Sequence, residues 1–279
     1  GGGFTDAFLV KFNSDGVRQW GTYYGGSDYD YCNSVAIDGS DYVYLAGETN
    51  SMVAIATSGS HQSSFGDNYD AFLVKFNSSG VRQWGTYYGG SSEDYGKSVA
   101  TDGSGYVYLA GITNSINAIA TSGSHQSSIG GEYQYYDAFL VKFNSNGVRQ
   151  WGTYYGGSDF DWGYSVTTDG SGYVYLTGET SSSDSIATAG SHQSSRGGYD
   201  EAFLVKFNSN GVRQWGTYYG GGREDWCNSV ATDGSDYVYL AGSTESSNAI
   251  ATTGSHQSSI GSVYPECDAF LVKFNSNGV

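Results

Sequence analysis

The stretch DAFLVKFNSDGVRQWGTYYGG, residues 6–26, decides the fold because the chain repeats it at a nearly fixed period. Its first half returns almost letter for letter at 70–77, 137–144, 201–208 and 268–275, whereas its second half occurs only four times. The spacing between successive copies alternates between 64 and 67 residues. A period of this length predicts an array of similar structural units, and it takes precedence over any domain estimate from chain length.

Each unit contains four predicted β-strands, and no segment has helical periodicity. In residues 7–12 both alternating sets of side chains are largely apolar, as expected for a strand that is packed on both faces. Residues 98–111, SVATDGSGYVYLAG, place two β-rich stretches around an Asp-Gly-Ser-Gly turn, which predicts a hairpin. Because a four-stranded antiparallel sheet with two apolar faces must stack on copies of itself, we expect an all-β protein, a β-propeller of four-stranded blades.

The spacing within each unit is fixed except in one segment. The alanine of AFLVKF always precedes the glycine of YLAG or YLTG by 40 residues, and that glycine precedes the histidine of GSHQSS by 14. From this histidine to the next alanine the distance is 10 or 13, which indicates an exposed loop. We expect one repeat domain over 1–279, with units at 6–69, 70–136, 137–200 and 201–267 and a partial fifth unit at 268–279. The alternating spacing also suggests a paired period within a longer array.

The motifs DGSGYVYLAG, GSHQSS and DAFLVKFNSNGVRQWGTYYGG resemble the bacterial SBBP β-propeller repeats. Those repeats run roughly Asp-x-x-Gly-Asn-x-Tyr-Val-x-Gly, then Asp-Ala-Phe, then Tyr-Leu-Gly-Gly. The resemblance covers essentially the whole chain and implies the propeller fold. Two features depart from the family: GSHQ stands where a Pro-Gly-Ala-Tyr-Gln type of sequence is common, and just over four units are present where the family name implies seven.

The formal net charge of −16 excludes several classes of partner. Nine of the twelve basic residues recur at repeat positions, so they form no basic stripe, and nucleic acid is not an expected partner. No apolar window reaches 18 residues, so membrane insertion is not expected either. The acidity favours solubility and is compatible with a divalent cation.

The segments that follow YYGG carry the most chemical variety. Each has an aspartate in sixth place and an aromatic residue in seventh: Asp30 and Tyr31, Asp94 and Tyr95, Asp161 and Trp162, Asp225 and Trp226. They share one face of the predicted propeller, here called the loop face, with the long connection that contains GSHQSS. The opposite face, the turn face, is made of tight turns and is expected to offer little for binding.

Two interpretations of these eight residues remain. They can form an acidic and aromatic ring that binds Ca²⁺ or stacks on sugars. Alternatively, each aspartate accepts hydrogen bonds from the crossover backbone while the aromatic ring fills the gap between blades. The second interpretation is favoured, because a position repeated in every blade usually builds the blade. Candidate calcium ligands are Asp28, Asp30, Asp159 and Asp161, although their spacing matches neither an EF-hand nor the nonapeptide repeat. No other cofactor is expected.

No catalytic constellation stands out. The four histidines, His61, His125, His192 and His256, occupy one repeat phase, which predicts a repeated structural hydrogen bond within the long connection. A general base or metal ligand would need a partner at close range. No Gly-x-Ser-x-Gly elbow occurs together with a suitable histidine and aspartate. Nearly identical units also argue against one specialised site, so we expect no enzymatic activity.

The three cysteines are too few for a disulfide scaffold and lack metal-ligand spacing. A Cys227–Cys267 bridge or a Cys32–Cys267 bridge is a candidate, and either implies an oxidising, extracellular setting. A free thiol or an intermolecular bond is the alternative.

The sequence therefore predicts a non-enzymatic, extracellular or cell-surface structural or adhesive protein. An unpaired apolar strand is a template for association, so we expect self-association head to tail, into fibres, through the terminal strands. The alternative function is a lectin-like or calcium-dependent propeller that binds cell-surface glycans with its loop face.

Overall fold

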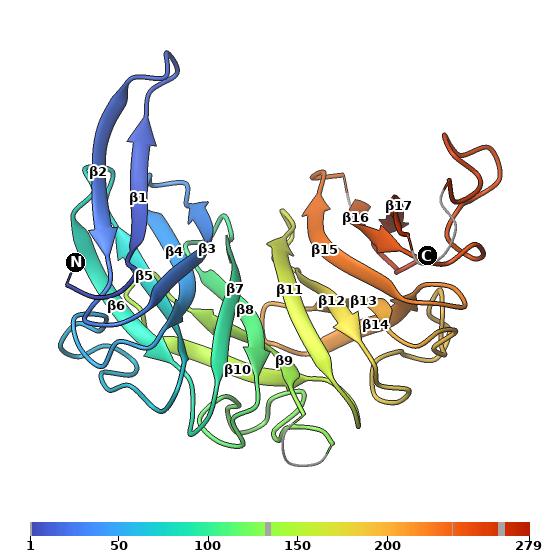
Figure 1. The fold of residues 1–279 in the computed structure, drawn as a ribbon, viewed down its shortest axis with the longest axis horizontal. Coiled ribbons are helices and arrows are strands. Elements are labelled where there is room, and N and C mark those ends of the chain that lie inside the picture. The colour runs from blue at the N-terminus through green and yellow to red at the C-terminus, as the bar shows by residue number, and fades with distance from the viewer. Residues whose placement is uncertain (1, 132–134, 236, 262–265) are drawn as a thin grey trace.

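The computed structural model describes residues 2–131, 135–235, 237–261 and 266–279, and its regular elements are all β-strands (Figure 1). No helix in these ranges is long and apolar enough to cross a membrane. Five antiparallel sheets follow one another along the chain. Within each sheet, the strands that are adjacent in sequence pair with each other.

The first sheet has two strands, β1 (Ala7–Phe12) and β2 (Arg18–Tyr24). The second contains β3 (Asp30–Ile37), β4 (Val43–Thr49), β5 (Asp70–Phe76) and β6 (Arg82–Tyr88). The third contains β7 (Asp94–Thr101), β8 (Val107–Thr113), β9 (Asp137–Phe143) and β10 (Arg149–Tyr155). The fourth contains β11 (Asp161–Thr168), β12 (Val174–Thr180), β13 (Glu201–Phe207) and β14 (Arg213–Tyr219). The last has three strands, β15 (Asp225–Thr232), β16 (Tyr237–Thr244) and β17 (Asp268–Asn275).

The predicted four-stranded antiparallel blades are confirmed. Each complete sheet starts at the aspartate after YYGG and ends with the next YYGG, so it combines the second half of one sequence unit with the first half of the next. Figure 1 shows the sheets along an arc, with β1 and β2 at one end and β15–β17 at the other. The first strands of successive sheets, β3, β7, β11 and β15, are neighbours along its inner side.

Consecutive sheets pack face to face through an apolar core. We call the face toward the preceding sheet the leading face and the face toward the following sheet the trailing face. Between the third and fourth sheets, the trailing face supplies Tyr108, Ala110, Ala138, Leu140, Trp151 and Tyr155. The leading face opposite supplies Val166, Val174, Leu176, Phe203, Val205, Phe207 and Tyr218. The other three junctions bury residues at the same repeat positions, so every internal sheet is apolar on both faces.

Two hydrogen bonds recur at every junction beside this core. The tryptophan of VRQW donates its indole N–H to a serine carbonyl in the next sheet's NSNG-type turn, as in Trp84 to Ser145 at 3.0 Å. The second tyrosine of TYYGG donates its hydroxyl to an isoleucine carbonyl in the long connection of the next sheet, as in Tyr155 to Ile186 at 2.7 Å. The indole N–H and the tyrosine hydroxyl lose hydrogen bonds to water when the chain folds, and each gains a hydrogen bond to a backbone carbonyl.

The long connection between the second and third strands of a sheet covers the outer edge of the fourth. In the second sheet, the Thr57 N–H donates to the Gly85 carbonyl at 2.8 Å, and the Tyr87 N–H donates to the Gln62 carbonyl at 3.2 Å. Thr121 and Gln126 make the same bonds with β10. The connection therefore satisfies backbone groups that an edge strand leaves open.

The glycine of YLAG is required by a close approach of two backbones. A Cβ on Gly111 would lie 1.9 Å from the carbonyl oxygen of Tyr95, far inside van der Waals contact. The cause is an irregularity in β7 between Gly96 and Ser98, which shifts the pairing of β7 with β8. The same motif in the other sheets meets the same obstacle, so the glycine recurs in every unit.

We expect Tyr155→Phe to lower the free energy of unfolding by about 1–2 kcal/mol, because the buried Ile186 carbonyl loses its shorter hydrogen bond and keeps only the one from Arg213 at 3.4 Å. Urea denaturation followed by tryptophan fluorescence measures this change. Tyr199→Phe is the matched control, since Tyr199 is 76% exposed, and it should stay within about 0.5 kcal/mol of the parent. Equal effects of both variants would contradict a role for this hydrogen bond.

Candidate functional site

The four predicted aspartates of the loop face are fully buried. Asp94 accepts hydrogen bonds from the Gly90 N–H and the Ser115 hydroxyl, both at 2.8 Å. The equivalent groups hold the other three, Asp30, Asp161 and Asp225. This arrangement matches the structural interpretation: the aspartate ties the crossover to the start of the next sheet.

A second carboxyl group lies beside each of these aspartates, and the sequence did not reveal it. It belongs to the first residue of DAFLVKF or EAFLVKF, and it is fully buried at Asp70, Asp137 and Glu201 and partly buried at Asp6. In the second sheet this is Asp70, whose Oδ2 accepts from the Gln62 side chain at 3.0 Å and from the Gly66 N–H at 2.9 Å. A Cβ on Gly89 would lie 2.6 Å from both Asp70 Oδ1 and Asp94 Oδ2. The first glycine of YYGG therefore lies between two carboxyl groups, where a side chain would not fit. Its recurrence in every unit is the feature of the sequence that could have indicated the two neighbouring carboxyl groups.

Burial makes these carboxyl groups hold their protons more tightly. It raises the pKa of Asp70 and of Asp94 to about 7, and the charge of Asp94 adds to the effect on Asp70. In the next pair, burial raises the pKa of Asp137 to about 8, with a contribution from Asp161, whose own pKa is raised to about 7. Asp70 Oδ1 and Asp137 Oδ1 have no hydrogen-bond partner within the described residues.

The candidate calcium ligands are not gathered into a metal site. Asp28 and Asp159 each accept a hydrogen bond from the backbone N–H of the following residue, at 3.0 and 2.9 Å. Asp30 and Asp161 are buried, as described above. Among the described residues, no group of three or more histidine, cysteine, aspartate or glutamate side chains is placed to hold a metal ion.

Two of the four predicted aromatic residues, Tyr95 and Trp162, belong to one chain of ring contacts on the loop face. Tyr95 lies between Tyr69 and Tyr136, with ring centroids 5.8 and 6.4 Å away. Phe160 stacks on Tyr136 at 6.3 Å and on Trp162 at 5.6 Å. We call these five residues the aromatic arc. Each of them is partly exposed, so the arc offers ring surface to solvent.

Tyr31 stacks on Tyr29, with the two ring centroids 6.1 Å apart. Within the arc, the Tyr136 hydroxyl donates a hydrogen bond to the Glu93 carboxylate at 2.5 Å. Trp226 contributes a hydrogen bond to Glu179. Two residues of the arc, Tyr95 and Trp162, were named from the sequence, whereas Tyr69, Tyr136 and Phe160 were not.

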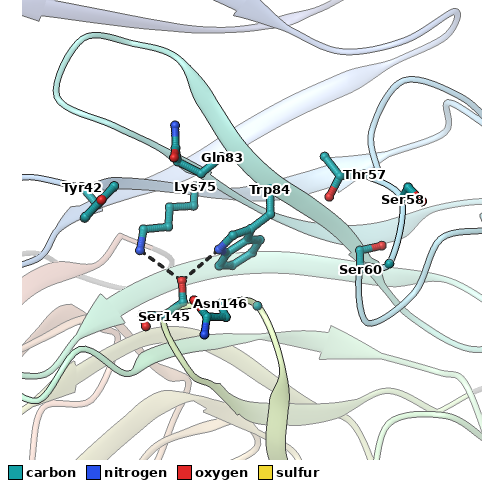
Figure 2. A pocket seen from close by; sticks show the side chains of 11 residues that line it. Tyr42, Thr57, Ser58, Ser60, Lys75, Gln83, Trp84, Ser145 and Asn146 are labelled. Atoms are coloured by element: carbon teal, nitrogen blue, oxygen red, sulfur yellow. Dashed lines mark hydrogen bonds between the residues drawn. The ribbon is translucent and has the colours of Figure 1, made fainter.

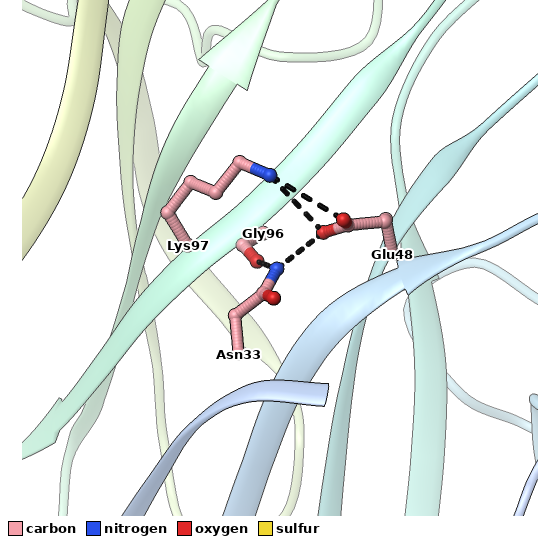
Figure 3. A network of polar contacts seen from close by, with 4 residues as sticks. All are labelled: Asn33, Glu48, Gly96 and Lys97. Atoms are coloured by element: carbon pink, nitrogen blue, oxygen red, sulfur yellow. Dashed lines mark hydrogen bonds and ion pairs between the residues drawn. The ribbon is translucent and has the colours of Figure 1, made fainter. Parts of the chain in front are cut away.

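A polar network links the second and third sheets on their inner side (Figure 3). The Lys97 ammonium lies 3.4 Å from the Glu48 carboxylate, and the Asn33 side chain donates to Glu48 and to the Gly96 carbonyl. Burial raises the pKa of Glu48, and the positive charge of Lys97 opposes that shift. These contacts join β3, β4 and β7, so the network positions sheets relative to one another.

Three of the four histidines, His61, His125 and His192, belong to the junctions between sheets, whereas His256 is exposed. His61 packs against Tyr88 of its own sheet and Phe143 of the next, at 6.0 and 5.6 Å between ring centroids. His125 and His192 make the equivalent contacts. Ring packing across a junction thus takes the place of the predicted hydrogen bond within the connection. Burial lowers the pKa of His61 and His125 to about 4, so both are neutral at pH 7.

Neither candidate disulfide is present in the structure, where Cys32, Cys227 and Cys267 are free thiols. Cys227 is buried in the last junction, where its thiol donates to the Ser229 and Ala241 carbonyls. Cys267 is exposed. Cys227 and Cys267 were expected on the same face of the propeller. They do not form a disulfide because the Cys227 sulfur lies in the apolar core and Cys267 lies at the surface.

The turn face, which was expected to offer little for binding, holds a pocket of about 410 Å³ between the second and third sheets (Figure 2). The side chains of Tyr42, Lys75 and Trp84 form its inner wall. The turn at 145–147 of the next sheet and the connection at 57–60 close its sides. The next junction repeats it with Tyr106, Lys142 and Trp151 and the same volume. We call these the junction pockets.

We expect the free energy of unfolding to fall as the pH rises from about 4 to 8. Aspartates in the unfolded chain ionise near about pH 4, whereas the folded chain keeps protons on Asp70, Asp94, Asp137 and Asp161 until pH 7 or above. His61 and His125 act in the opposite direction, because their lowered pKa keeps them neutral in the folded chain, but the four carboxyl groups outnumber them. The folded state therefore binds more protons in this window, and stability decreases with rising pH.

Urea titrations at several pH values measure this slope. Asp137→Asn should make it shallower, because the amide keeps an acceptor for the Gly130 N–H without the charge. Asp15→Asn, in an exposed turn, is the control and should leave the slope as it is. Stability that is constant or rises over this range would show that these carboxyl groups are ionised in the folded chain.

Comparison with known proteins agrees with this architecture. The family model of the SBBP β-propeller repeat matches residues 19–51, 83–117, 150–184 and 214–248. No match was found among curated protein sequences. Each matched segment begins in the last strand of one sheet and runs through the first two strands of the next, so it spans one junction. With four such matches in register with its sheets, the chain belongs to the SBBP β-propeller repeat family.

Proposed function

We propose that this chain is a non-enzymatic, extracellular structural or adhesive repeat protein that associates head to tail with further copies of itself. The supporting observation is that the first and last sheets expose residues which every internal junction buries. These two exposed surfaces are the two halves of one contact.

The leading face of the β1–β2 sheet is open. Phe8 and Tyr23 are 67% and 72% exposed, whereas their equivalents in the second sheet, Phe72 and Tyr87, are 0% and 1% exposed. Large apolar side chains at this density on one surface are a feature of interaction sites.

The trailing face of the β15–β17 sheet is open as well. Leu271 is 75% exposed, whereas Leu204 at the same repeat position is fully buried. Ala241 and Ala269, beside Leu271, are exposed too. Leucines at this position meet the phenylalanines of a following leading face in the internal junctions. A second copy can therefore place its Phe8 where an internal junction places Phe203.

Strand pairing supplies a further means of contact. Residues 7–12 and 269–274 share the sequence AFLVKF, so β1 of a second copy can compete with β17 for the edge of β16. Since β1 brings β2 with it, the exchange would complete a four-stranded sheet. Repeated head-to-tail contacts give a ring where the rotation closes and a fibre where it does not.

The other parts of the proposal rest on chemistry. Sheets that are nearly identical argue against one specialised site for a reaction, and the four histidines are spread over separate repeats. A chain rich in Gly, Ser and Tyr with few charges suits an extracellular surface. No cofactor is part of this function.

We expect light scattering on the purified chain to show mass that grows with concentration. Phe8→Glu should remove the leading contact and Leu271→Glu the trailing contact, so each variant alone should be monomeric or nearly so. Their mixture retains one intact face of each kind and should stop at dimers. Val148→Glu, in an exposed turn outside both faces, is the control and should associate like the parent. A parent chain that stays monomeric at high concentration, or variants that associate normally, would refute the proposal.

A second candidate is glycan binding by the loop face, which the aromatic arc favours because exposed rings stack on sugars. A glycan array with and without calcium tests it. Loss of a signal in Trp162→Ala, with the parent's unfolding midpoint retained, would support this candidate, and an empty array would exclude it.

A further inference from the structure

The junction pockets have features of a ligand site that the proposed association does not use. The first lies on the turn face where β5 and β6 meet the turn of the following sheet, away from both end faces (Figure 2). Its volume of about 410 Å³ falls within the range of small-ligand sites.

A buried cation lies at the wall of this pocket. Lys75 is only 6% exposed, yet no carboxylate of the described residues forms an ion pair with it. Its ammonium donates one hydrogen bond, to the Ser145 carbonyl at 3.1 Å, and lies 3.8 Å from the centre of the Tyr42 ring. An ammonium has three donors, and burying it is costly. Burial lowers the pKa of Lys75, and the charge of Asp38 opposes that shift without forming an ion pair with the ammonium. The ring and the carbonyl offset part of this cost, and an anionic group in the pocket would offset more.

The remaining wall suits a polyhydroxylated ligand. Ser58, Ser60, Gln83 and Asn146 line the pocket. The Ser60 hydroxyl already donates to the Gln62 carbonyl at 3.1 Å, and the Gln83 side chain donates to the Val81 carbonyl at 2.9 Å, so these two offer acceptor oxygens to a ligand. The hydroxyl of Ser58 and the amide of Asn146 both donate and accept hydrogen bonds, as sugar hydroxyls require. Trp84 is occupied by Ser145 and by Gly147, which packs on its indole, so it shapes the wall.

The site is repeated at the next junction. Lys142 donates to the Ser209 carbonyl at 2.9 Å and lies 3.9 Å from the Tyr106 ring centre, in a pocket of the same volume. Two equal sites one sheet apart suit a polymer whose sugar units repeat, because linked units bind with a higher effective concentration.

We propose that the junction pockets bind carboxylate-bearing sugar units of an acidic polysaccharide, with the ammonium groups of Lys75 and Lys142 paired to the sugar carboxylates. The serine, glutamine and asparagine side chains at the rim bind the hydroxyl groups. This is a different surface from the aromatic arc, and it needs no calcium.

Calorimetric titration of the full chain with oligogalacturonate, a polymer of uronic acid, tests the proposal. Neutral dextran oligosaccharide of matched length is the control ligand, and the buffer contains about 150 mM salt to screen long-range charge. We expect saturable binding of the acidic polymer and at least tenfold weaker binding of the neutral one.

Substitution of the two lysines tests whether their ammonium groups hold the carboxylates. Lys75→Met with Lys142→Met keeps the aliphatic stems and should weaken binding of the acidic polymer about tenfold or more. Lys11→Met is the matched control: Lys11 has the same repeat position and donates to the Ser78 carbonyl, but its two-stranded sheet provides no tyrosine beneath it. An unchanged unfolding midpoint shows that each variant is folded.

Three results would overturn the proposal. They are equal affinity for both polymers, an unchanged affinity in the double variant, or no binding of the acidic polymer at all. Loss of binding in Trp162→Ala, with the double variant unaffected, would place the ligand on the loop face and would also refute the junction pockets as its site.

Discussion

Every internal sheet of this chain has two apolar faces, and it can bury both only against other sheets of the same kind. The contact of Leu140 with the Phe203 side of the next sheet is the repeated form of this constraint. The rest of the structure is arranged around it. The tryptophan and tyrosine hydrogen bonds lie beside the core, the histidine rings pack across it, and the arc follows from stacking sheet upon sheet. Stability in such arrays is approximately a sum of sheets and junctions.

The sequence was sufficient to predict the strands and their antiparallel order. AFLVKF is apolar at both alternating sets of positions, and the turns carry Asn-Ser-x-Gly. Because the same strand and turn patterns occur in several nearly identical copies, the assignment of each strand does not depend on one segment alone. Each family match begins in the last strand of one sheet and ends after the second strand of the next, so it includes residues from both sides of a junction.

The chemistry of individual side chains was harder to predict. Asp70 and Asp94 belong to separate segments that come together only in the folded chain. Two carboxyl groups are also not expected to lie side by side in a core, because like charges repel each other. The histidine contacts were missed for a similar reason, because Phe143 belongs to another repeat. The junction pockets were missed because they form between one sheet and the turn of the next, and neither half is a pocket alone.

The covering of each outer edge by the long connection has a consequence for the direction of growth. Because Thr57 and Gln62 already occupy backbone groups of β6, a neighbouring molecule finds no free edge to pair with at the rim of that sheet. Lateral stacking of arcs into sheets of the amyloid type is therefore disfavoured. Under the proposed head-to-tail association, this covering of β6, β10 and β14 favours addition along the axis on which the sheets already follow one another.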